Sequence, residues 1–171
     1  MQQLTSGDVV VHPQGVATVR GIISMTVKDV TYSCYELHLV NAEVKIYVPL
    51  GSSLELKPVA TGQDVCTLWE LLSQKQEISL NYTSWKANWF KNKTALQQCT
   101  FEERAKVYVH LLRRKTLAAQ EQDMLGRLEK FLVAEVAAIT GRTIQEIKKE
   151  FKTRGGLRYE YGYTETSVDE E

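Results

Sequence analysis

Apolar and polar residues alternate along the first third of the chain and recur with a longer period afterwards. In the stretches 35–39 and 44–48 every second residue is apolar, and in 8–12 Val9 and Val11 alternate with Asp8, Val10 and His12. A period of two is typical of strands that bury one face. From Thr61 onward the spacing becomes helical, because apolar residues return every three or four positions. The pattern therefore predicts strands first and helices second.

Turn signals separate the predicted strands. Gly, Pro, Asn and Asp residues interrupt the alternation at four places, which are residues 6–8, 13–15, 28–29 and 41–43. The last strand stops at Pro49, which has no N–H to donate and so suits a strand end or a sheet edge. These spacings suit a meander of four or five short strands that closes into a small barrel.

The helical part shows three apolar stripes and clear helix boundaries. The stripes comprise Leu68, Leu71 and Leu72, then Phe101, Ala105, Tyr108 and Leu112, then Leu125, Leu128, Leu132, Val136 and Ile139. Thr100 with Glu103 and Thr143 with Glu146 match the capping box, in which each side chain satisfies a backbone N–H at a helix start. Gly141 supplies a left-handed stop. We expect about five helices.

The fold class that follows is α+β, with a small N-terminal β-barrel followed by a C-terminal all-helical domain. We place the first domain at residues 1–55 and the second at 62–152, because Ser, Gly and Pro cluster between Gly51 and Gly62. Residues 153–171 carry paired glycines, repeated tyrosines and an acidic end without a sustained period. We expect them to form a mobile tail.

Positive charge is concentrated in one segment of a neutral chain. The sequence holds 21 Lys or Arg and 21 Asp or Glu, yet residues 81–120 hold eight of the bases and two of the acids, a net charge of +6. Within it, the stretch NYTSWKANWFKNK at 81–93 combines two tryptophans and a phenylalanine with three lysines and no acid. A local basic patch favours a polyanion bound at one site.

The remaining composition favours a cytoplasmic binding protein over an enzyme. The first residues lack a signal-peptide pattern, and no apolar run reaches the ~20 residues of a membrane span. Cys34, Cys66 and Cys99 are widely spaced, so we expect reduced, buried thiols and no metal site. The three histidines are scattered, and no nucleophile, phosphate-loop or zinc-protease motif is present. We expect no enzyme and no cofactor, although a site assembled from distant residues would leave no local trace.

Four segments together resemble the CarD/CdnL family of bacterial RNA-polymerase-binding transcription regulators. They are SGDVVVHPQGVATVRGI at 6–22, KIYVP at 45–49, TSW at 83–85 and TIQEIKKEF at 143–151, in an order and spacing similar to the family's. The resemblance covers residues 4 to about 152. It implies a Tudor-like barrel that binds the polymerase β subunit. It also implies a helical domain that contacts promoter DNA at the upstream edge of the melted bubble, in a cytoplasmic, nucleoid-associated and monomeric protein.

On this resemblance Trp85 is the residue that wedges into the minor groove. An apolar wedge holds base steps unstacked while nearby cations bind the phosphates. Trp85 follows the N-cap pair Thr83-Ser84, which favours exposure, whereas Trp89 suits a core. The alternative is that both rings are buried, as large aromatic residues mostly are.

The expected DNA-binding cations are Lys86, Lys91, Lys93, Arg104, Arg113 and Arg114, with Lys115 beside the last two. Relatives carry arginines two and three residues after the tryptophan, and this chain has Ala87 and Asn88 there. DNA affinity is then either weaker or shifted to the cations listed. The lysines also suit a solvated face, and residues 113–115 suit the negative end of a helix dipole.

The strand that ends at Pro49 is the expected polymerase contact. The contact residues expected on this strand are Lys45, Tyr47, Val48 and Pro49. Met25, on a preceding strand, is expected to lie beside them. An open strand edge binds a partner by strand addition, with alternate side chains setting specificity. Several relatives have arginine at the positions of Met25 and Tyr47, so a less salt-sensitive contact is expected here. The alternative is that both are ordinary surface residues.

Three functional hypotheses remain. The first is a regulator that binds the RNA polymerase β subunit and stabilises the promoter open complex through Trp85. The second is a protein-interaction module of the transcription machinery without direct DNA contact. The third is a small enzyme, which would need a deep pocket that holds titratable groups with perturbed pKa values.

Overall fold

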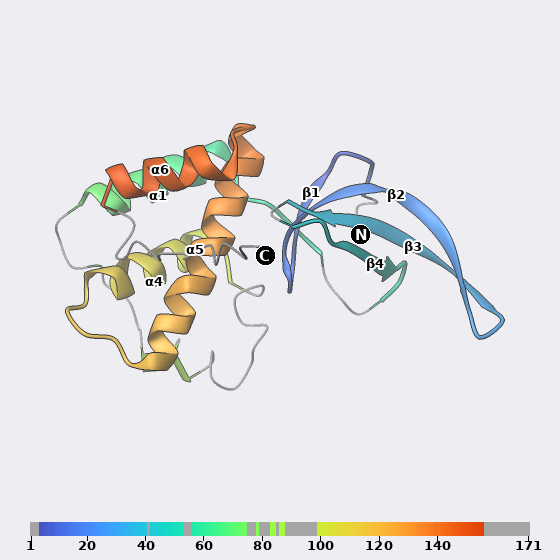
Figure 1. Cartoon of the computed structure of the whole chain (residues 1–171), viewed down its shortest axis with the longest axis horizontal. Helices are drawn as coiled ribbons and strands as arrows, with labels where there is room; N and C mark the ends of the chain where they lie inside the picture. Colours follow the sequence, from blue (N-terminus) through green and yellow to red (C-terminus); the bar gives the residue numbers. More distant parts are fainter. Residues whose placement is uncertain are drawn as a thin grey trace, which may run out of the picture.

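The computed structural model describes residues 4–40, 42–52, 56–74, 78, 83–84, 86–87 and 99–155. An antiparallel sheet comes first, and a group of helices follows (Figure 1). The strands are β1 (Val9–His12), β2 (Gly15–Val27), β3 (Val30–Leu39), β4 (Lys45–Pro49) and β5 (Lys57–Pro58). The helices are α1 (Gly62–Ser73), α4 (Phe101–Arg113), α5 (Ala119–Thr140) and α6 (Ile144–Thr153). The α+β class is confirmed, with four helices of described bounds where about five were expected.

The sheet is open in the described residues, so the closed barrel is not confirmed. Its strand order is β4-β3-β2-β1-β5, which leaves β4 and β5 as the two edges. β5 reaches β1 through only two residue pairs, Val10 with Pro58 and Val11 with Lys57. A bulge between Val19 and Gly21 interrupts the pairing of β2 with β3, and such bulges bend a strand. The sheet therefore curves without joining its edges (Figure 1).

The turn at Lys28-Asp29 is confirmed. These two residues join Val27 to Val30, which form the last pair of β2 with β3. Both have positive φ angles, 48° for Lys28 and 62° for Asp29. Two-residue hairpins favour such a turn because its twist matches that of the flanking strands. The long hairpin can therefore extend well beyond the sheet core (Figure 1).

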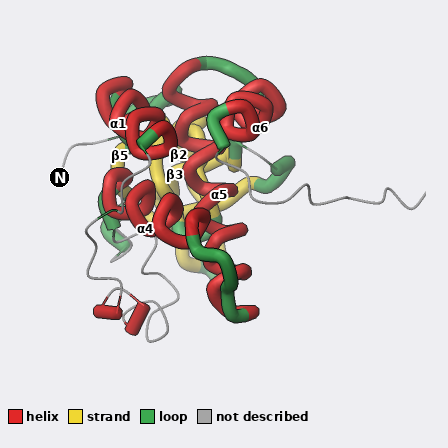
Figure 2. The backbone as a smooth tube through the Cα atoms, turned by 90° about the vertical axis from the view of Figure 1, so that its left-hand side faces the viewer, coloured by secondary structure: helices red, strands yellow, loops and turns green. Residues whose placement is uncertain are grey.

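The alternation predicted for the first strand is wrong. Val10 and Val11 are each 1% exposed and His12 is also buried, whereas Val9 is only half-buried. The reason is that β1 is covered on both faces. Val10 joins the sheet core, whereas Val11 lines a cleft together with Phe101 of α4. Figure 2 shows the helices standing in front of the sheet when the molecule is viewed from its helical side.

The helical core confirms the predicted stripes. Leu68, Tyr108, Leu128 and Leu132 are fully buried, and the margins of each stripe, such as Ile139, are partly buried. The other stripe residues that are partly buried are Leu72 and Leu112. The sheet has a separate core of its own, made by Val10, Ala17, Val19, Leu37 and Val48.

Helix starts follow the capping signals. The boxes of Thr100 with Glu103 and Thr143 with Glu146 are both formed. α1 starts with a third box, in which Asp64 replaces the usual Glu opposite Thr61. Gly141 ends α5 with a φ of 66°, as its left-handed stop requires.

The three cysteines are free thiols, but they are not all buried. Cys34 is buried, Cys99 is half-buried and Cys66 is exposed. Cys66 lies on α1 next to the buried Val65, on the side of the helix that faces away from the core. The expectation of buried thiols therefore holds for Cys34 alone.

Candidate functional site

Among the described residues, the outer edge of β4 has no neighbouring strand, so its backbone groups on that side are open. The Leu39 N–H donates to the Val44 carbonyl at 3.1 Å, and the Leu50 N–H donates to the Ser33 carbonyl at 2.8 Å. In an antiparallel ladder the hydrogen-bonded pairs alternate with non-bonded pairs. The pairs of β4 with β3 then place the N–H and C=O groups of Lys45 and Tyr47 on the side away from β3. β4 thus has the free edge that strand addition needs.

Two side chains of β4 stand on the face opposite the sheet core. Tyr47 is 40% exposed and pairs with Glu36 of β3, and Lys45 pairs with His38. Glu36 Oε1 lies 2.9 Å from His38 Nε2 and 3.3 Å from Lys45 Nζ. Hydrogen bonds from His38 and Lys45 lower the pKa of Glu36. The charge of Lys45 is therefore matched within the sheet, and Tyr47 is the uncharged group beside it.

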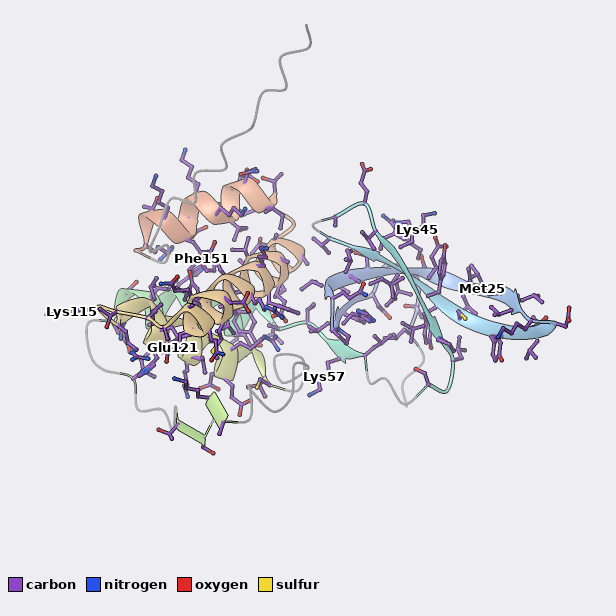
Figure 3. All side chains as sticks on the ribbon, turned by 60° about the horizontal axis from the view of Figure 1, so that its bottom comes forward. Met25, Lys45, Lys57, Lys115, Glu121 and Phe151 are labelled. Carbon is purple, nitrogen blue, oxygen red and sulfur yellow. The ribbon has the colours of Figure 1, made fainter. Side chains whose placement is uncertain are left out.

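Met25 lies on this same face. It pairs with Tyr32 across β2 and β3, and the next pair on that face is Val27 with Val30 at the hairpin tip. Val27, Val30 and Tyr32 are 52%, 50% and 45% exposed. Together with Met25 and Tyr47 they form an apolar face on strands β2, β3 and β4. The labels Met25 and Lys45 in Figure 3 mark this part of the sheet.

Sequence reasoning missed the hairpin part of this face. Val27 and Val30 flank a turn. Strand periodicity predicts which residues are buried, and it does not predict exposed apolar residues beside a turn. The missed signal was the pair of adjacent apolar residues on either side of Lys28-Asp29. Among the described residues, the most exposed large apolar side chains all come from residues 22–50.

Val48 and Pro49 differ from Tyr47 in how their side chains and backbone groups are placed. Val48 is 4% exposed and packs in the sheet core, so its side chain does not reach a partner. The expectation that Val48 binds polymerase stays a prediction, and the structure gives its side chain a packing role. Pro49 is exposed and pairs with Cys34, and its carbonyl accepts the Ser52 N–H at 3.1 Å. It ends the strand, as expected for a residue without an N–H.

Three of the predicted DNA-binding residues lie outside the described residues. They are Trp85, Lys91 and Lys93, and Trp89 also lies outside. The neighbouring Lys86 is described, with its side chain 36% exposed.

Lys86 and Arg114 converge on one buried acid, Glu121 near the start of α5. The Glu121 Oε1 atom lies 2.8 Å from Lys86 Nζ and 2.8 Å from Arg114 NH1. The other carboxylate oxygen accepts the Ala118 N–H at 3.0 Å at the start of α5, where Ala118 itself has no side-chain acceptor to return the contact. The Glu121 side chain is only 3% exposed. Two of the expected DNA-binding cations are thus held by the same carboxylate.

Arg113 binds backbone oxygens at the end of α1. Its guanidinium donates to the Leu71 carbonyl at 2.8 Å and to the Gln74 carbonyl. These oxygens are among the last carbonyls of α1, which have no partner within the helix. The contact joins α4 to α1. Lys115, the next cation but one, is exposed in the loop before α5.

Arg104 is inside the helical domain. Its side chain is 3% exposed and donates to Glu135 Oε2 at 2.5 Å and to the Cys99 carbonyl at 2.7 Å. Burial raises the pKa of Glu135, and the guanidinium and the Ala60 N–H oppose that rise. This placement argues against a DNA contact by Arg104, and Arg104 is corrected to a residue of the domain interior. The sequence signal was the single acid, Glu135, within the apolar run FLVAEVAAI.

A cleft of about 550 Å³ separates the sheet from the helices near this ion pair. Its lining includes Val11 of β1, Lys57 of β5, Asp64 of α1, Glu102 of α4 and Glu135 of α5. The Glu135 carboxylate already accepts a hydrogen bond from Arg104, so we assign this ion pair a structural role. In the described part of the chain, no three His, Cys, Asp or Glu side chains gather into a possible metal site.

No helix within the described ranges combines the length and the apolar character that a membrane span requires.

Residues 4–60 match the family model described as CarD-like/TRCF RID domain. The matched range contains all five strands and ends two residues before α1 begins. It confirms the resemblance noted in the sequence over the part of the chain that carries the free β4 edge. No curated protein matches the chain.

Proposed function

The chain contains a CarD-like/TRCF RID domain, an RNA-polymerase-interacting domain, and from this premise we propose that it is a transcription regulator. In this proposal the sheet binds the polymerase β subunit, and the helical domain stabilises the promoter open complex through Trp85. The family to which the RID domain belongs is one of protein interaction and not of catalysis. The chain is thus an interaction module of the transcription machinery.

The observation that carries the polymerase part is the free edge of β4. Lys45 and Tyr47 direct their backbone N–H and C=O groups outward, as the register with β3 requires. A strand of the partner adds to such an edge through main-chain hydrogen bonds, and the side chains on one face select the partner. Tyr47 lies at the centre of that edge and is 40% exposed.

The face beside the edge indicates an apolar partner surface. Met25, Val27, Val30 and Tyr32 extend the contact from Tyr47 along the hairpin, while Lys45 is neutralised by Glu36. Burial of apolar area is insensitive to moderate salt, whereas exposed ion pairs weaken as salt screens them. We therefore expect the contact with the polymerase β subunit to depend little on ionic strength.

The DNA part of the proposal rests on the basic segment and its tryptophan. Residues 81–120 carry a net charge of +6. Trp85 follows Thr83 and Ser84, which are already helical and so are not the N-cap pair expected from the sequence. An indole inserted at the edge of the bubble would oppose restacking, while Lys91 and Lys93 bind the phosphates. Lys86 and Arg114 add positive charge nearby, because their head groups are held by Glu121. Arg104 is left out of this set because it is buried, and Arg113 contributes mainly charge because its donors hold α1.

Binding to the purified polymerase β subunit tests the sheet part. Tyr47→Asp places a charge at the centre of the proposed contact, and Val44→Asp is the matched control. Val44 is similarly exposed, at 45% against 40%, but its pairing with Leu39 puts it on the opposite face. We expect Tyr47→Asp to weaken binding by at least about tenfold, which corresponds to roughly 1.4 kcal/mol, and Val44→Asp to leave it nearly unchanged. Equal effects would overturn the proposed edge contact.

A second function is a protein-interaction module without DNA contact. It is favoured by one observation, that Lys86, Arg113 and Arg114 all make contacts within the protein. A salt titration of the polymerase–promoter complex with and without the protein separates the two functions. Phosphate neutralisation makes the logarithm of the affinity fall linearly with the logarithm of the salt concentration. An unchanged slope on adding the protein would favour the second function.

A further inference from the structure

We propose that Glu121 is a positioning residue that clamps Lys86, the residue after Trp85 in the sequence, at the start of α5. This inference deepens the proposed function and rests on it for its consequence at the promoter. The clamp itself is a property of the free protein. It assigns a role to a buried acid that no sequence motif for DNA binding includes.

The first argument is that Glu121 joins three parts of the chain. Lys86 comes from the segment that carries Trp85, Arg114 comes from the end of α4, and Ala118 precedes α5. Their donors reach both oxygens of one carboxylate at 2.8–3.0 Å. Lys86 is 35 residues from Glu121 in sequence, so the contact is a tertiary one. Figure 3 places Glu121 in the helical part, far from Met25 and Lys45 on the sheet.

The second argument is electrostatic. The Glu121 side chain is 3% exposed, and a carboxylate so withdrawn from water is stable as an ion only when donors and cations surround it. Hydrogen bonds in which both partners are charged are stronger than neutral ones. The lysine that follows the proposed wedge in sequence is therefore anchored at its ammonium group.

The third argument concerns what a wedge requires. A side chain that must enter a base step is effective only when its support is fixed, because the freedom lost on binding opposes the contact. Supporting contacts of this kind hold a functional residue in its productive position. Lys86 is adjacent in sequence to Trp85, so in this proposal an anchor at its ammonium group limits the freedom of the segment that carries the tryptophan.

A competing view is that Lys86 serves only as a phosphate contact and that Glu121 competes with DNA for it. The two views predict opposite signs for Glu121→Gln. If Glu121 merely occupies Lys86, its neutralisation frees a cation and lengthens the open-complex lifetime. If Glu121 positions the segment, neutralisation shortens that lifetime although the net charge becomes more positive.

The experiment compares Glu121→Gln, Lys86→Met, Lys86→Arg and the control Glu102→Gln in the full chain. Gln at position 121 keeps an oxygen for the Ala118 N–H, and Glu102 is an exposed acid of α4 paired with Lys106. Hydrogen–deuterium exchange of the free protein is followed in peptides that cover residues 83–87. We expect exchange to rise roughly threefold to tenfold in Glu121→Gln and Lys86→Met, and to stay near the original rate in Lys86→Arg and Glu102→Gln. Unchanged exchange in both clamp variants would overturn the clamp.

The second measurement is the lifetime of the open complex with the cognate polymerase. We expect Glu121→Gln to shorten it in the direction of Trp85→Ala, and Glu102→Gln to leave it unchanged. A lifetime that is unchanged or longer in Glu121→Gln, when Trp85→Ala shortens it, would overturn the positioning role. If Trp85→Ala itself had no effect, the proposed wedge would fail, and the exchange data alone would decide whether Glu121 clamps the segment. Lys86→Met keeps Arg114 and Ala118 on Glu121, so it remains informative if Glu121→Gln does not fold.

Discussion

The Arg104 guanidinium donates to Glu135 Oε2 at 2.5 Å, and both side chains are almost fully removed from water. The same guanidinium reaches the Cys99 carbonyl just before α4, and the Ala60 N–H of the link to α1 is directed at Glu135. The pair therefore ties α4, α5 and the connection from the sheet at one point. Arg104, first expected at a DNA-binding surface, instead stabilises the point where α4, α5 and the connection from the sheet meet.

Loss of one member of this pair should destabilise the fold strongly. Glu135→Gln leaves the Arg104 charge buried without its counter-ion, which typically costs about 3–5 kcal/mol. We expect that loss in urea unfolding monitored by far-UV circular dichroism. The double variant Arg104→Met with Glu135→Leu should recover much of it, because an apolar pair of similar volume avoids the desolvation of both charges. A loss below about 1 kcal/mol in Glu135→Gln, within the range for exposed pairs, would contradict this interpretation.

The helix caps should make the protein less stable in acid. Hydrogen bonds from the Thr61 N–H and hydroxyl lower the pKa of Asp64, and the Thr143 N–H and hydroxyl do the same for Glu146. A carboxyl whose pKa is lower in the folded state contributes stability above its unfolded pKa and loses it as the pH falls through the folded value. The loss is expected below about pH 4, the ordinary range of carboxyl groups.

The variant Thr143→Ala tests this acid effect. It removes one cap of α6, so it should lower stability by about 1 kcal/mol at neutral pH and by less at pH 2.5, where protonation of Glu146 weakens the cap. Urea unfolding at both pH values gives the two differences. An equal or larger difference at pH 2.5 would contradict the assignment of Glu146 to the cap.

The hairpin turn offers a stabilising change. Lys28 and Asp29 adopt φ angles of 48° and 62°, which strain side chains and which Asn and Gly adopt readily. We expect Lys28→Asn combined with Asp29→Gly to raise the unfolding free energy by roughly 0.5–1 kcal/mol. Thermal unfolding measures the gain, and a lower melting temperature would show that the original side chains contribute more than their backbone strain.

Local signals predicted most of the fold. Thr100, Thr143 and Gly141 mark helix boundaries through hydrogen bonds and backbone angles within a few residues, so their roles are visible in the sequence. The stripe from Leu125 to Ile139 was predicted for the same reason. The first strand was not, because Val11 is buried by contact with the helical part, and that contact comes from residues distant in sequence.

The candidate site was less predictable than the fold. The edge position of β4 followed from Pro49, which cannot extend a ladder. The partners of the cations could not be inferred, because Arg104 meets an acid 31 residues away and Lys86 one 35 residues away. A count of charges in a segment of sequence does not show which of them are neutralised inside the fold. The net charge of the segment therefore overstated the cations available to DNA.

The open-complex lifetime tests the central claim most directly. Complexes of the cognate polymerase on a linear promoter are challenged with heparin in the presence of the original chain, Trp85→Ala or Trp85→Phe, each at a concentration that saturates the polymerase. We expect Trp85→Ala to shorten the lifetime by about tenfold, equivalent to roughly 1.4 kcal/mol, and Trp85→Phe to retain part of the effect because it keeps an apolar wedge. A lifetime that is unchanged or longer with Trp85→Ala, at equal polymerase occupancy, would contradict the claim that this tryptophan holds the promoter open.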